Sequence, residues 1–334
     1  MKKFAINGFG RIGRAIVRSL FEHGGRVDGL QVINCGIGDI DTYLHLLRYD
    51  SVHGVFHHAT KIGESKIKIA DQEIEVIFET DPSKIDWKKY GVEIIVEATG
   101  QFTTRELASK HLKSGASKVI ITAPAKDVDA TVVYGVNNQV ITEDADIISA
   151  GSCTTNCLAP PLKALLDTNV KIQSGFMTTI HAYTNDQNLV DAGHNDLRRA
   201  RAAAVSMIPS STGAAKAIGL VLPELNGKMD GVAVRVPVPN VSMIDVKLVL
   251  ESDISVKEVH SAIKEFSATY PNILSYEKQE LVSIDYNHSV YSSIFDATQT
   301  KVVEGNLLRF AAWYDNEWGF SNRVLDILAH LSEM

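Results

Sequence analysis

Apolar residues in the first half of the chain come in short runs that leave no polar face. Such runs cover residues 3–7, 30–34, 93–97, 118–122 and 147–149, and segments with helical spacing of apolar residues separate them. Strands that are apolar on both faces are typical of a parallel sheet covered by helices on both sides. The pattern therefore predicts an α/β domain with a doubly wound parallel sheet.

Apolar and polar residues alternate more often in the second half. The stretches 176–181, 232–236, 244–250 and 308–314 alternate or are rich in β-branched and aromatic residues, which favours strands. Helical spacing recurs at 213–220 and 256–269, and helices there would cover one face of a sheet. We expect an α+β domain with a mostly antiparallel sheet, joined to the first domain near Cys153.

Composition and charge narrow the class of protein. The 334 residues exceed the size at which one core usually keeps growing, and 45% hydrophobic with 22% charged residues describes a folded domain pair. A net charge of −7 offers no basic field for nucleic acid. No apolar run is long enough for a membrane span, and the N-terminus leads directly into a strand without a signal-peptide core. We expect a cytoplasmic protein without nucleic-acid or membrane partners.

The three cysteines give neither a disulfide framework nor a metal site. An odd number in a long chain argues against paired cysteines. Cys153 and Cys157 lack a second pair of ligands at zinc spacing. No metal is expected.

A glycine motif joins the first strand to the first helix. Gly8, Gly10 and Gly13 form G-x-G-x-x-G directly after residues 3–7, and apolar residues with helical spacing follow at 14–22. Glycines at these places permit a tight turn, let the backbone approach a pyrophosphate and let the helix lie close to the strand. The motif predicts a Rossmann-type dinucleotide site; the alternative is a purely structural turn.

Other strand ends would complete that site. Thr122 follows a strand at the edge where a doubly wound sheet binds its ligand. The second strand normally ends at an acidic residue that holds the adenosine ribose, but Cys35 stands there. Asp39 and Asp41 follow, and either could bend back to replace the missing carboxylate.

Cys153 is a candidate nucleophile. It precedes small hydroxylated residues and then apolar Leu158 and Ala159, as at the start of a helix. Unpaired backbone N–H groups at a helix start stabilise a thiolate. The alternative is a buried structural cysteine, the commoner role for a free thiol.

Five segments in order along the chain resemble the phosphorylating glyceraldehyde-3-phosphate dehydrogenase family. They are Ile6-Asn7-Gly8-Phe9-Gly10-Arg11-Ile12-Gly13-Arg14, Ser152-Cys153-Thr154-Thr155-Asn156-Cys157, His181-Ala182-Tyr183-Thr184-Asn185-Asp186-Gln187, Asp196-Leu197-Arg198-Arg199-Ala200-Arg201 and Trp313-Tyr314-Asp315-Asn316-Glu317. The resemblance implies a homotetramer in which a last helix, at 319–331, packs back on the cofactor domain. We therefore expect a dinucleotide domain of residues 1–152 and 317–334 and a catalytic domain of residues 153–316.

The resemblance also implies a reaction. The family oxidises glyceraldehyde 3-phosphate to 1,3-bisphosphoglycerate, in glycolysis or gluconeogenesis, through a thioester on the cysteine and hydride transfer to NAD or NADP. Cys153 would be the nucleophile, and His181 would lower its pKa and move the proton of the hemithioacetal. The partners are then a small phosphorylated aldehyde and inorganic phosphate.

The remaining site residues follow by the same resemblance. Substrate phosphate would be held by Thr184, Asp186 and Arg235. Inorganic phosphate would be held by Ser152, Thr154, Arg199, Thr212 and Gly213, of which the last two also precede a predicted helix. Cofactor contacts would come from Gly8, Gly10, Arg11, Ile12, Gly13, Cys35, Thr122, Ala192, Gly193 and Asn316.

Three positions depart from the pattern of the NAD-using members of the family. Cys35, Thr80 and the pair Ala192-Gly193 stand where those members carry aspartate, arginine and Leu-Pro. All lie on the adenosine side of the cofactor in the family. We therefore expect NADP to be accepted, either preferred or alongside NAD.

Two other functions remain open at this point. Thr298-Gln299-Thr300 and the segment 315–320 resemble erythrose-4-phosphate dehydrogenase, whereas the segment 181–186 follows the glyceraldehyde-phosphate pattern. A non-catalytic binding protein on the same scaffold is the alternative from another class. Intact Cys153, His181 and Arg235 argue against it.

Overall fold

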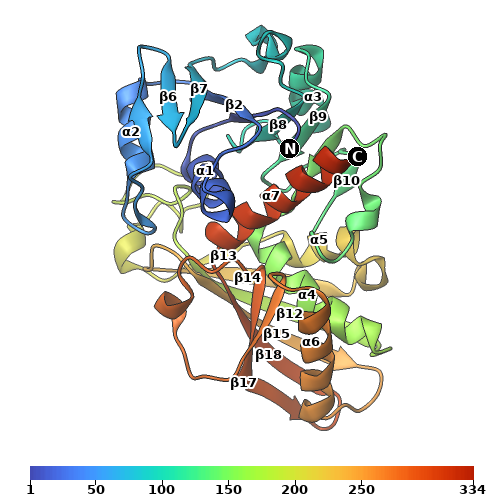
Figure 1. Ribbon diagram of the computed structural model, residues 1–334. Coiled ribbons are helices and arrows are strands. Elements are labelled where there is room, and N and C mark those ends of the chain that lie inside the picture. The colour runs from blue at the N-terminus through green and yellow to red at the C-terminus, as the bar shows by residue number, and fades with distance from the viewer. The chain divides into compact units, whose positions relative to one another are not determined.

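The computed structural model describes residues 1–334, and the chain forms two compact units (Figure 1). Unit 1 comprises Met1–Tyr134, Asn138–Ser152 and Ser321–Met334. Unit 2 comprises Gly135–Asn137 and Cys153–Phe320. No helix in either unit combines the length and the apolar character that crossing a membrane requires.

A nine-stranded sheet forms the centre of unit 1, in the order β10-β11-β9-β8-β1-β2-β7-β6-β5. Every pair from β10 to β7 is parallel, and only the edge pairs β7–β6 and β6–β5 are antiparallel. The strands are β1 (Phe4–Asn7), β2 (Leu30–Asn34), β5 (Ala59–Lys61), β6 (Lys66–Ile69), β7 (Gln72–Ile77), β8 (Ile94–Glu97), β9 (Lys118–Ile121), β10 (Ala130–Thr131) and β11 (Ile147–Ser149), with a separate hairpin of β3 (Tyr49–Asp50) and β4 (Gly54–Val55).

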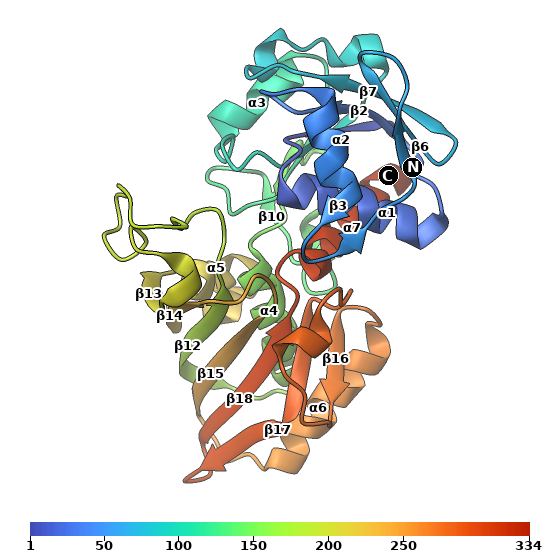
Figure 2. The same cartoon turned by 90° about the vertical axis from the view of Figure 1, so that its left-hand side faces the viewer.

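The helices of unit 1 begin and end at residues suited to those places. Asp39 caps α2 and Thr104 caps α3 by accepting backbone N–H groups, and α1 ends at Gly25 in the left-handed conformation. Helix α7 packs beside α1 (Figures 1 and 2), and burial raises the pKa of Asp326 on α7, opposed by Arg323 and by His23 of α1. The helices are α1 (Arg11–Gly24), α2 (Ile40–Arg48), α3 (Arg105–Lys113) and, from Ser321 onward, α7 (Trp318–Glu333).

Unit 2 is a seven-stranded mixed sheet in the order β13-β14-β12-β15-β18-β17-β16. Its pairs are antiparallel except β12–β14 and β16–β17. Helices α4 and α6 pack on each other and on the strands β17 and its neighbours (Figure 2). The elements are α4 (Cys153–Asp167), β12 (Ile172–Ala182), β13 (Ile208–Ser211), α5 (Ala214–Val221), β14 (Met229–Val236), β15 (Ser242–Leu250), α6 (Val256–Thr269), β16 (Leu274–Glu277), β17 (Ser293–Val303) and β18 (Leu307–Tyr314).

The predicted fold class is confirmed, with differences at the ends of elements. Strand β15 alternates buried and partly exposed residues along its whole length, as expected for a sheet with one covered face. Helix α1 begins three residues before the predicted start, and α7 extends beyond the predicted 319–331 at both ends. Short 3₁₀ helices complete the chain at Pro82–Lys84, Trp87–Tyr90, Asn138–Val140, Ala203–Val205, Pro223–Leu225 and Ser283–Tyr286.

Candidate active site

Cys153 is the first residue of α4, at the carboxyl side of the loop that follows β11. Its side chain is partly exposed. Cys157, one turn further along the helix, is fully buried, and its sulfur lies 3.5 Å from the hydroxyl of Ser293. Of the two cysteines on this helix, only Cys153 can reach a substrate.

His181 faces the sulfur of Cys153 from the end of β12. Its Nε2 lies 3.6 Å from Cys153 Sγ. Its Nδ1 lies 2.7 Å from the carbonyl oxygen of Ala182 and 2.6 Å from Nη1 of Arg235, which also donates to that oxygen at 3.1 Å. His181 and Arg235 are register partners in the parallel pair β12–β14, so both side chains leave the same face of the sheet.

Burial is the main influence on the pKa values of Cys153 and His181, which lie near Arg235. Burial, together with the positive charge of Arg235, lowers the pKa of His181 to about 3. Burial also raises the pKa of the Cys153 thiol, opposed by Arg235 and by hydrogen bonds at the start of α4. The groups that oppose the rise are Arg235 and the start of α4, and the role of His181 in lowering the thiol pKa stays a prediction.

Tyr314 is a supporting residue that had no role in the predictions from sequence. It lies at the end of β18 and is 1% exposed. Its hydroxyl is 2.9 Å from Thr154 Oγ1 and 2.9 Å from Thr179 Oγ1, and its ring meets His181 edge-on with centroids 5.9 Å apart. Tyr314 thus ties the start of α4 to β12. An aromatic residue in an alternating strand looks like core, so no sequence signal separated it from its neighbours.

The predicted anion-binding residues of unit 2 form a second group. Arg199 pairs with Asp186 and donates to the carbonyl oxygen of Ser211 at 3.3 Å. Arg199 and Asp186 both lie near enough to Arg235 to affect its pKa, which burial lowers first of all. The Nε of Arg235 is buried without a hydrogen-bond partner. Two guanidinium groups therefore lie near the cysteine–histidine pair.

The remaining predicted phosphate-binding residues differ in their exposure and in the hydrogen bonds that their polar groups already make. Thr212 Oγ1 accepts the backbone N–H of Ala214, and Gly213 is the N-cap of α5. The hydroxyl of Thr154 is already engaged by Tyr314. Thr184 is partly exposed, and Ser152 is the last residue of its segment of unit 1.

The glycine motif of unit 1 has the geometry that a pyrophosphate needs. Gly8 has a φ of 101°, and an added Cβ there would lie 2.6 Å from the backbone nitrogen of Thr99. A Cβ at Gly13 would lie 2.2 Å from the carbonyl oxygen of Gly8, whereas one at Gly10 would meet nothing within 4 Å. The loop therefore packs tightly on one side and is open on the other, and Gly10 supplies no side chain to cap α1. These residues fit a dinucleotide.

Other predicted cofactor residues of unit 1 surround this loop. The side chain of Arg11 is held by Asp50 through two hydrogen bonds of 3.0 and 3.2 Å, and Ile12 is partly exposed. Thr122 follows β9 and donates its backbone N–H to the carbonyl oxygen of Glu97. Cys35 follows β2 and is 7% exposed, and burial raises the pKa of its thiol to about 12.

Neither aspartate after Cys35 bends back toward the end of β2. Asp39 caps α2, with its carboxylate accepting from the backbone and the hydroxyl of Thr42 at 2.8 Å each. Asp41 pairs with Lys61 at 2.6 Å. The end of β2 therefore carries a neutral thiol and no carboxylate.

Three predicted cofactor residues belong to unit 2. Ala192 and Gly193 are exposed in a loop that Asn188 holds through a 2.8 Å hydrogen bond to the carbonyl oxygen of Ala192. Asn316 is 7% exposed, and its side-chain oxygen accepts from Ser242 Oγ at 2.9 Å. That bond orients the amide nitrogen of Asn316 away from Ser242.

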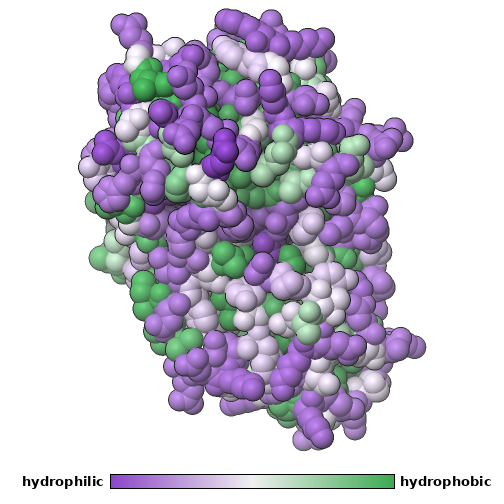
Figure 3. Space-filling model, viewed as in Figure 1, coloured by the Kyte–Doolittle hydropathy of each residue, from purple (hydrophilic) through white to green (hydrophobic).

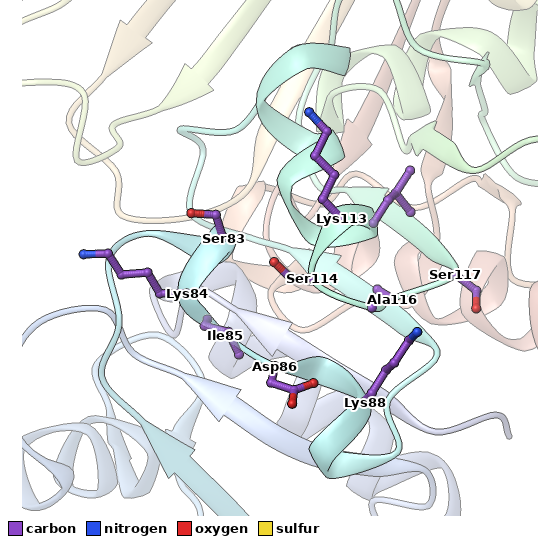
Figure 4. A pocket seen from close by; sticks show the side chains of 11 residues that line it. Ser83, Lys84, Ile85, Asp86, Lys88, Lys113, Ser114, Ala116 and Ser117 are labelled. Carbon is purple, nitrogen blue, oxygen red and sulfur yellow. The ribbon is translucent and has the colours of Figure 1, made fainter.

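A separate pocket of unit 1 contains none of the predicted site residues. It lies between the end of α3 and two 3₁₀ helices (Figure 4). Lys84, Lys88 and Lys113 line it but point in different directions (Figure 4). Cations that diverge do not form a phosphate site, and the nearby C-terminus of α3 disfavours an anion. No group of three or more His, Cys, Asp and Glu side chains is arranged to hold a metal ion.

A doubly wound dinucleotide fold combined with a unit that presents a cysteine–histidine pair defines the class of thiol-dependent, two-domain aldehyde dehydrogenases. Comparison with known families narrows the class. The model described as "Glyceraldehyde 3-phosphate dehydrogenase, NAD binding domain" matches residues 2–105, and that of the C-terminal domain of the same family matches residues 152–316. The chain belongs to the glyceraldehyde-3-phosphate dehydrogenase family, and its cofactor is of the NAD type.

Relatives similar to this chain cover nearly its whole length. The glyceraldehyde-3-phosphate dehydrogenase of Pseudomonas aeruginosa is 52% identical over 325 residues, which is 97% of this chain and 96% of that protein. Those of Xanthobacter flavus and Geobacillus stearothermophilus are 50% and 48% identical over 333 residues, covering 99% of this chain and 99% and 98% of theirs. The erythrose-4-phosphate alternative gains no support from these relatives.

Proposed function

We propose that this chain catalyses the phosphorylating oxidation of glyceraldehyde 3-phosphate to 1,3-bisphosphoglycerate. The observation that carries the proposal is the trio at the start of α4, in which Cys153 Sγ lies 3.6 Å from His181 Nε2 and Arg235 contacts the other imidazole nitrogen. Membership of the family supports the choice of substrate.

The first step is addition of the thiol to the aldehyde. A proton on His181 Nδ1 donates to the carbonyl oxygen of Ala182 and leaves Nε2 able to accept the thiol proton. The sulfur of Cys153 forms a bond to the aldehyde carbon while that proton passes through His181 to the carbonyl oxygen. A hemithioacetal results.

The second step converts the hemithioacetal to a thioester. His181 Nε2 takes the hydroxyl proton as the carbon loses a hydride, and the carbon–oxygen double bond re-forms. When bound, a nicotinamide dinucleotide accepts that hydride. An oxygen of inorganic phosphate then attacks the thioester carbon, the carbon–sulfur bond breaks, and Cys153 regains its proton from His181.

The phosphate groups of substrate and co-substrate bind to the charged side chains of unit 2. Arg235 and Thr184 hold the substrate phosphate, and the unpartnered Nε of Arg235 supports this role. Arg199, Thr212 and Gly213 hold inorganic phosphate at the start of α5 with Ser152 and Thr154. Asp186, which accepts from Arg199, orients that guanidinium, since a carboxylate would repel a phosphate at close range.

Assays of substitution variants test the assignment. Cys153→Ser should abolish phosphate-dependent reduction of the cofactor with glyceraldehyde 3-phosphate, because a serine hydroxyl is hardly ionised and forms no thioester. Cys157→Ala on the same helix is the matched control and should retain turnover. Turnover of Cys153→Ser within tenfold of the unmodified enzyme would remove Cys153 from the mechanism.

For the cofactor, we propose that the enzyme accepts NADP, either preferentially or alongside NAD. A carboxylate at the end of β2 would repel a 2′-phosphate by about 4 kcal/mol for unit charges 4 Å apart at an effective dielectric of 20. Cys35 is neutral, Asp39 and Asp41 are engaged elsewhere, and Ala192 and Gly193 are small. The neutral thiol, the two engaged aspartates and the two small residues all favour a site that admits the 2′-phosphate without repelling it.

The ratio of kcat/KM values for the two cofactors tests this preference. The combined variant Cys35→Asp, Ala192→Leu, Gly193→Pro should shift the ratio toward NAD, with folding checked by circular dichroism. A hundredfold or greater preference for NAD in the unmodified enzyme would refute the proposal.

We also propose a homotetramer that works in the cytoplasm, where its three free cysteines stay reduced. Large apolar residues reach the surface, and the face shown in Figure 3 has apolar patches between polar ones. The most exposed of those in unit 2 are Leu189, Val190, Leu197, Val205, Met207, Leu220 and Ile284, each at least 64% exposed. Contacts between copies would cover such a surface. Sedimentation should give a tetramer, and Val205→Asp with Met207→Asp should dissociate it; a monomer at every concentration would contradict the proposal.

A further inference from the structure

Three polar side chains meet in unit 1 where the central parallel strands end. Asn7 is the register partner of both Asn34 at the end of β2 and Glu97 at the end of β8. Asn34 Nδ2 donates to Asn7 Oδ1 at 2.6 Å, and Asn7 Nδ2 donates to Glu97 Oε2 at 2.5 Å. His111 of α3 continues the chain, with Nε2 3.0 Å from the same carboxylate oxygen. The four side chains are at most 2% exposed.

The other oxygen of Glu97 holds the loop that follows β8. Glu97 Oε1 accepts the backbone N–H of Thr99 at 2.8 Å and also the hydroxyl of Thr99. The nitrogen of Thr99 is the atom against which Gly8 packs, since a Cβ on Gly8 would lie 2.6 Å away from it. Glu97 therefore sets the position of the loop against which the glycine motif rests.

The hydrogen bonds around Glu97 and His111 indicate where their protons lie. Four donors converge on the two oxygens of Glu97, which suits a carboxylate, because it only accepts. His111 Nδ1 is buried without a partner, so a proton there would leave an unsatisfied N–H group. These contacts favour a proton on His111 Nε2, directed at Glu97.

We propose that Glu97 and His111 are positioning residues that set cofactor affinity by holding Thr99 against Gly8. Neither belongs to the chemistry at Cys153, and neither need touch the cofactor. If the network is broken, the loop after β8 and the glycine loop lose their fixed spacing, and the dinucleotide binds less tightly. Turnover at saturating cofactor is unaffected.

Two variants break the network in different ways. In Glu97→Gln the new amide group either faces the donors of Asn7 and His111 or loses the Thr99 contact, and we expect Kd for NAD and for NADP to rise about tenfold. His111→Leu removes one donor among the aromatic rings of Trp87 and Phe102 and should raise Kd about threefold. It provides the test if Glu97→Gln does not fold.

The double variant Asn7→Asp, Glu97→Gln reverses the polarity of the central hydrogen bond and should recover part of the lost affinity, because the new amide no longer opposes residue 7 although it still faces His111. In it the new amide donates to the new carboxylate, which still accepts from Asn34. Recovery distinguishes positioning from general destabilisation. Ile74→Val, at a fully buried position of β7, is the matched control: it should lower stability without changing Kd.

Isothermal titration calorimetry without aldehyde measures Kd, so the result does not depend on the proposed substrate. Steady-state kinetics should show a raised KM for the cofactor with kcat within about twofold of the unmodified enzyme. Iodoacetamide alkylation of Cys153 should be unchanged. Unmodified Kd values in folded Glu97→Gln or His111→Leu, or absence of recovery in the double variant, would overturn the proposal.

Discussion

Replacing Arg235 by leucine should make the Cys153 thiol less reactive. Arg235 carries a positive charge that favours the thiolate of Cys153, although burial outweighs it and raises the thiol pKa. The same charge disfavours a protonated His181. Because burial is the larger cause of the lowered His181 pKa, His181 stays neutral at pH 7 in the variant. Loss of the arginine therefore removes a charge that no imidazolium replaces.

The geometry sets the size of the effect. Arg235 Nη1 is 2.6 Å from one nitrogen of the His181 ring, and Cys153 Sγ is 3.6 Å from the other. The charge thus lies within about 8 Å of the sulfur, where it contributes about 2 kcal/mol at an effective dielectric of 20. Loss of this stabilisation in Arg235→Leu raises the thiol pKa by about 1.5 and lowers the thiolate fraction about thirtyfold at any pH below both pKa values.

Iodoacetamide alkylation of the substrate-free enzyme, followed from pH 6 to pH 10, measures this shift. The rate should fall about thirtyfold at pH 7 in Arg235→Leu, and the same ratio should hold wherever pH lies below both pKa values. Arg309→Leu is the control, since that arginine pairs with Asp245 at 2.9 Å and not with the trio. Superimposable profiles for Arg235→Leu and the unmodified enzyme would refute the electrostatic reasoning.

Three further substitutions test other parts of the structure. His181→Asn should keep the fold and slow turnover by about 10²–10⁴, the usual contribution of a positioned acid–base group; stopped-flow cofactor reduction measures it, and a smaller loss would assign the proton transfer elsewhere. Tyr314→Phe leaves the hydroxyls of Thr154 and Thr179 without their shared partner and should lower the free energy of unfolding in urea by about 1–3 kcal/mol. An unchanged midpoint would show that these hydrogen bonds do not stabilise the fold. Gly13→Ala should weaken cofactor binding or prevent folding, because its Cβ would lie 2.2 Å from the Gly8 carbonyl oxygen, whereas Gly24→Ala, with nothing within 4 Å, should be neutral or stabilising in both calorimetry and thermal melts.

Strands that are apolar on both faces could be predicted well from sequence. Residues 30–34 and 147–149 are the strands β2 and β11 with the same bounds, because short, largely apolar runs favour strands buried on both faces. The strands β6 and β7, near one edge of the sheet, were missed: they carry several lysines and glutamates, and their pairing depends on contacts that local propensity does not contain. The parallel pair β12–β14 was also missed, since strand direction follows from the long connection between the strands.

The site shows a similar division. Local patterns identified the glycine loop and the helix that begins at Cys153, because turns and helix starts depend on residues that are close in sequence. The contact of Arg235 with His181 joins residues from different strands, and only the register of the sheet creates it. The pKa shifts of Cys153 and His181 follow chiefly from burial, which is a property of the folded core and not of the sequence motif.

Enzymatic activity depends on the register of β12 against β14, so the recovery of activity also reports on folding. A slip by one residue would send His181 and Arg235 to opposite faces of the sheet, although most of the secondary structure would survive. Their pairing spans a long stretch of chain, and non-local contacts of this kind form late and slowly. During refolding from denaturant, far-ultraviolet circular dichroism should therefore recover before enzymatic turnover, and the interval between them measures how long the two strands take to find their correct alignment.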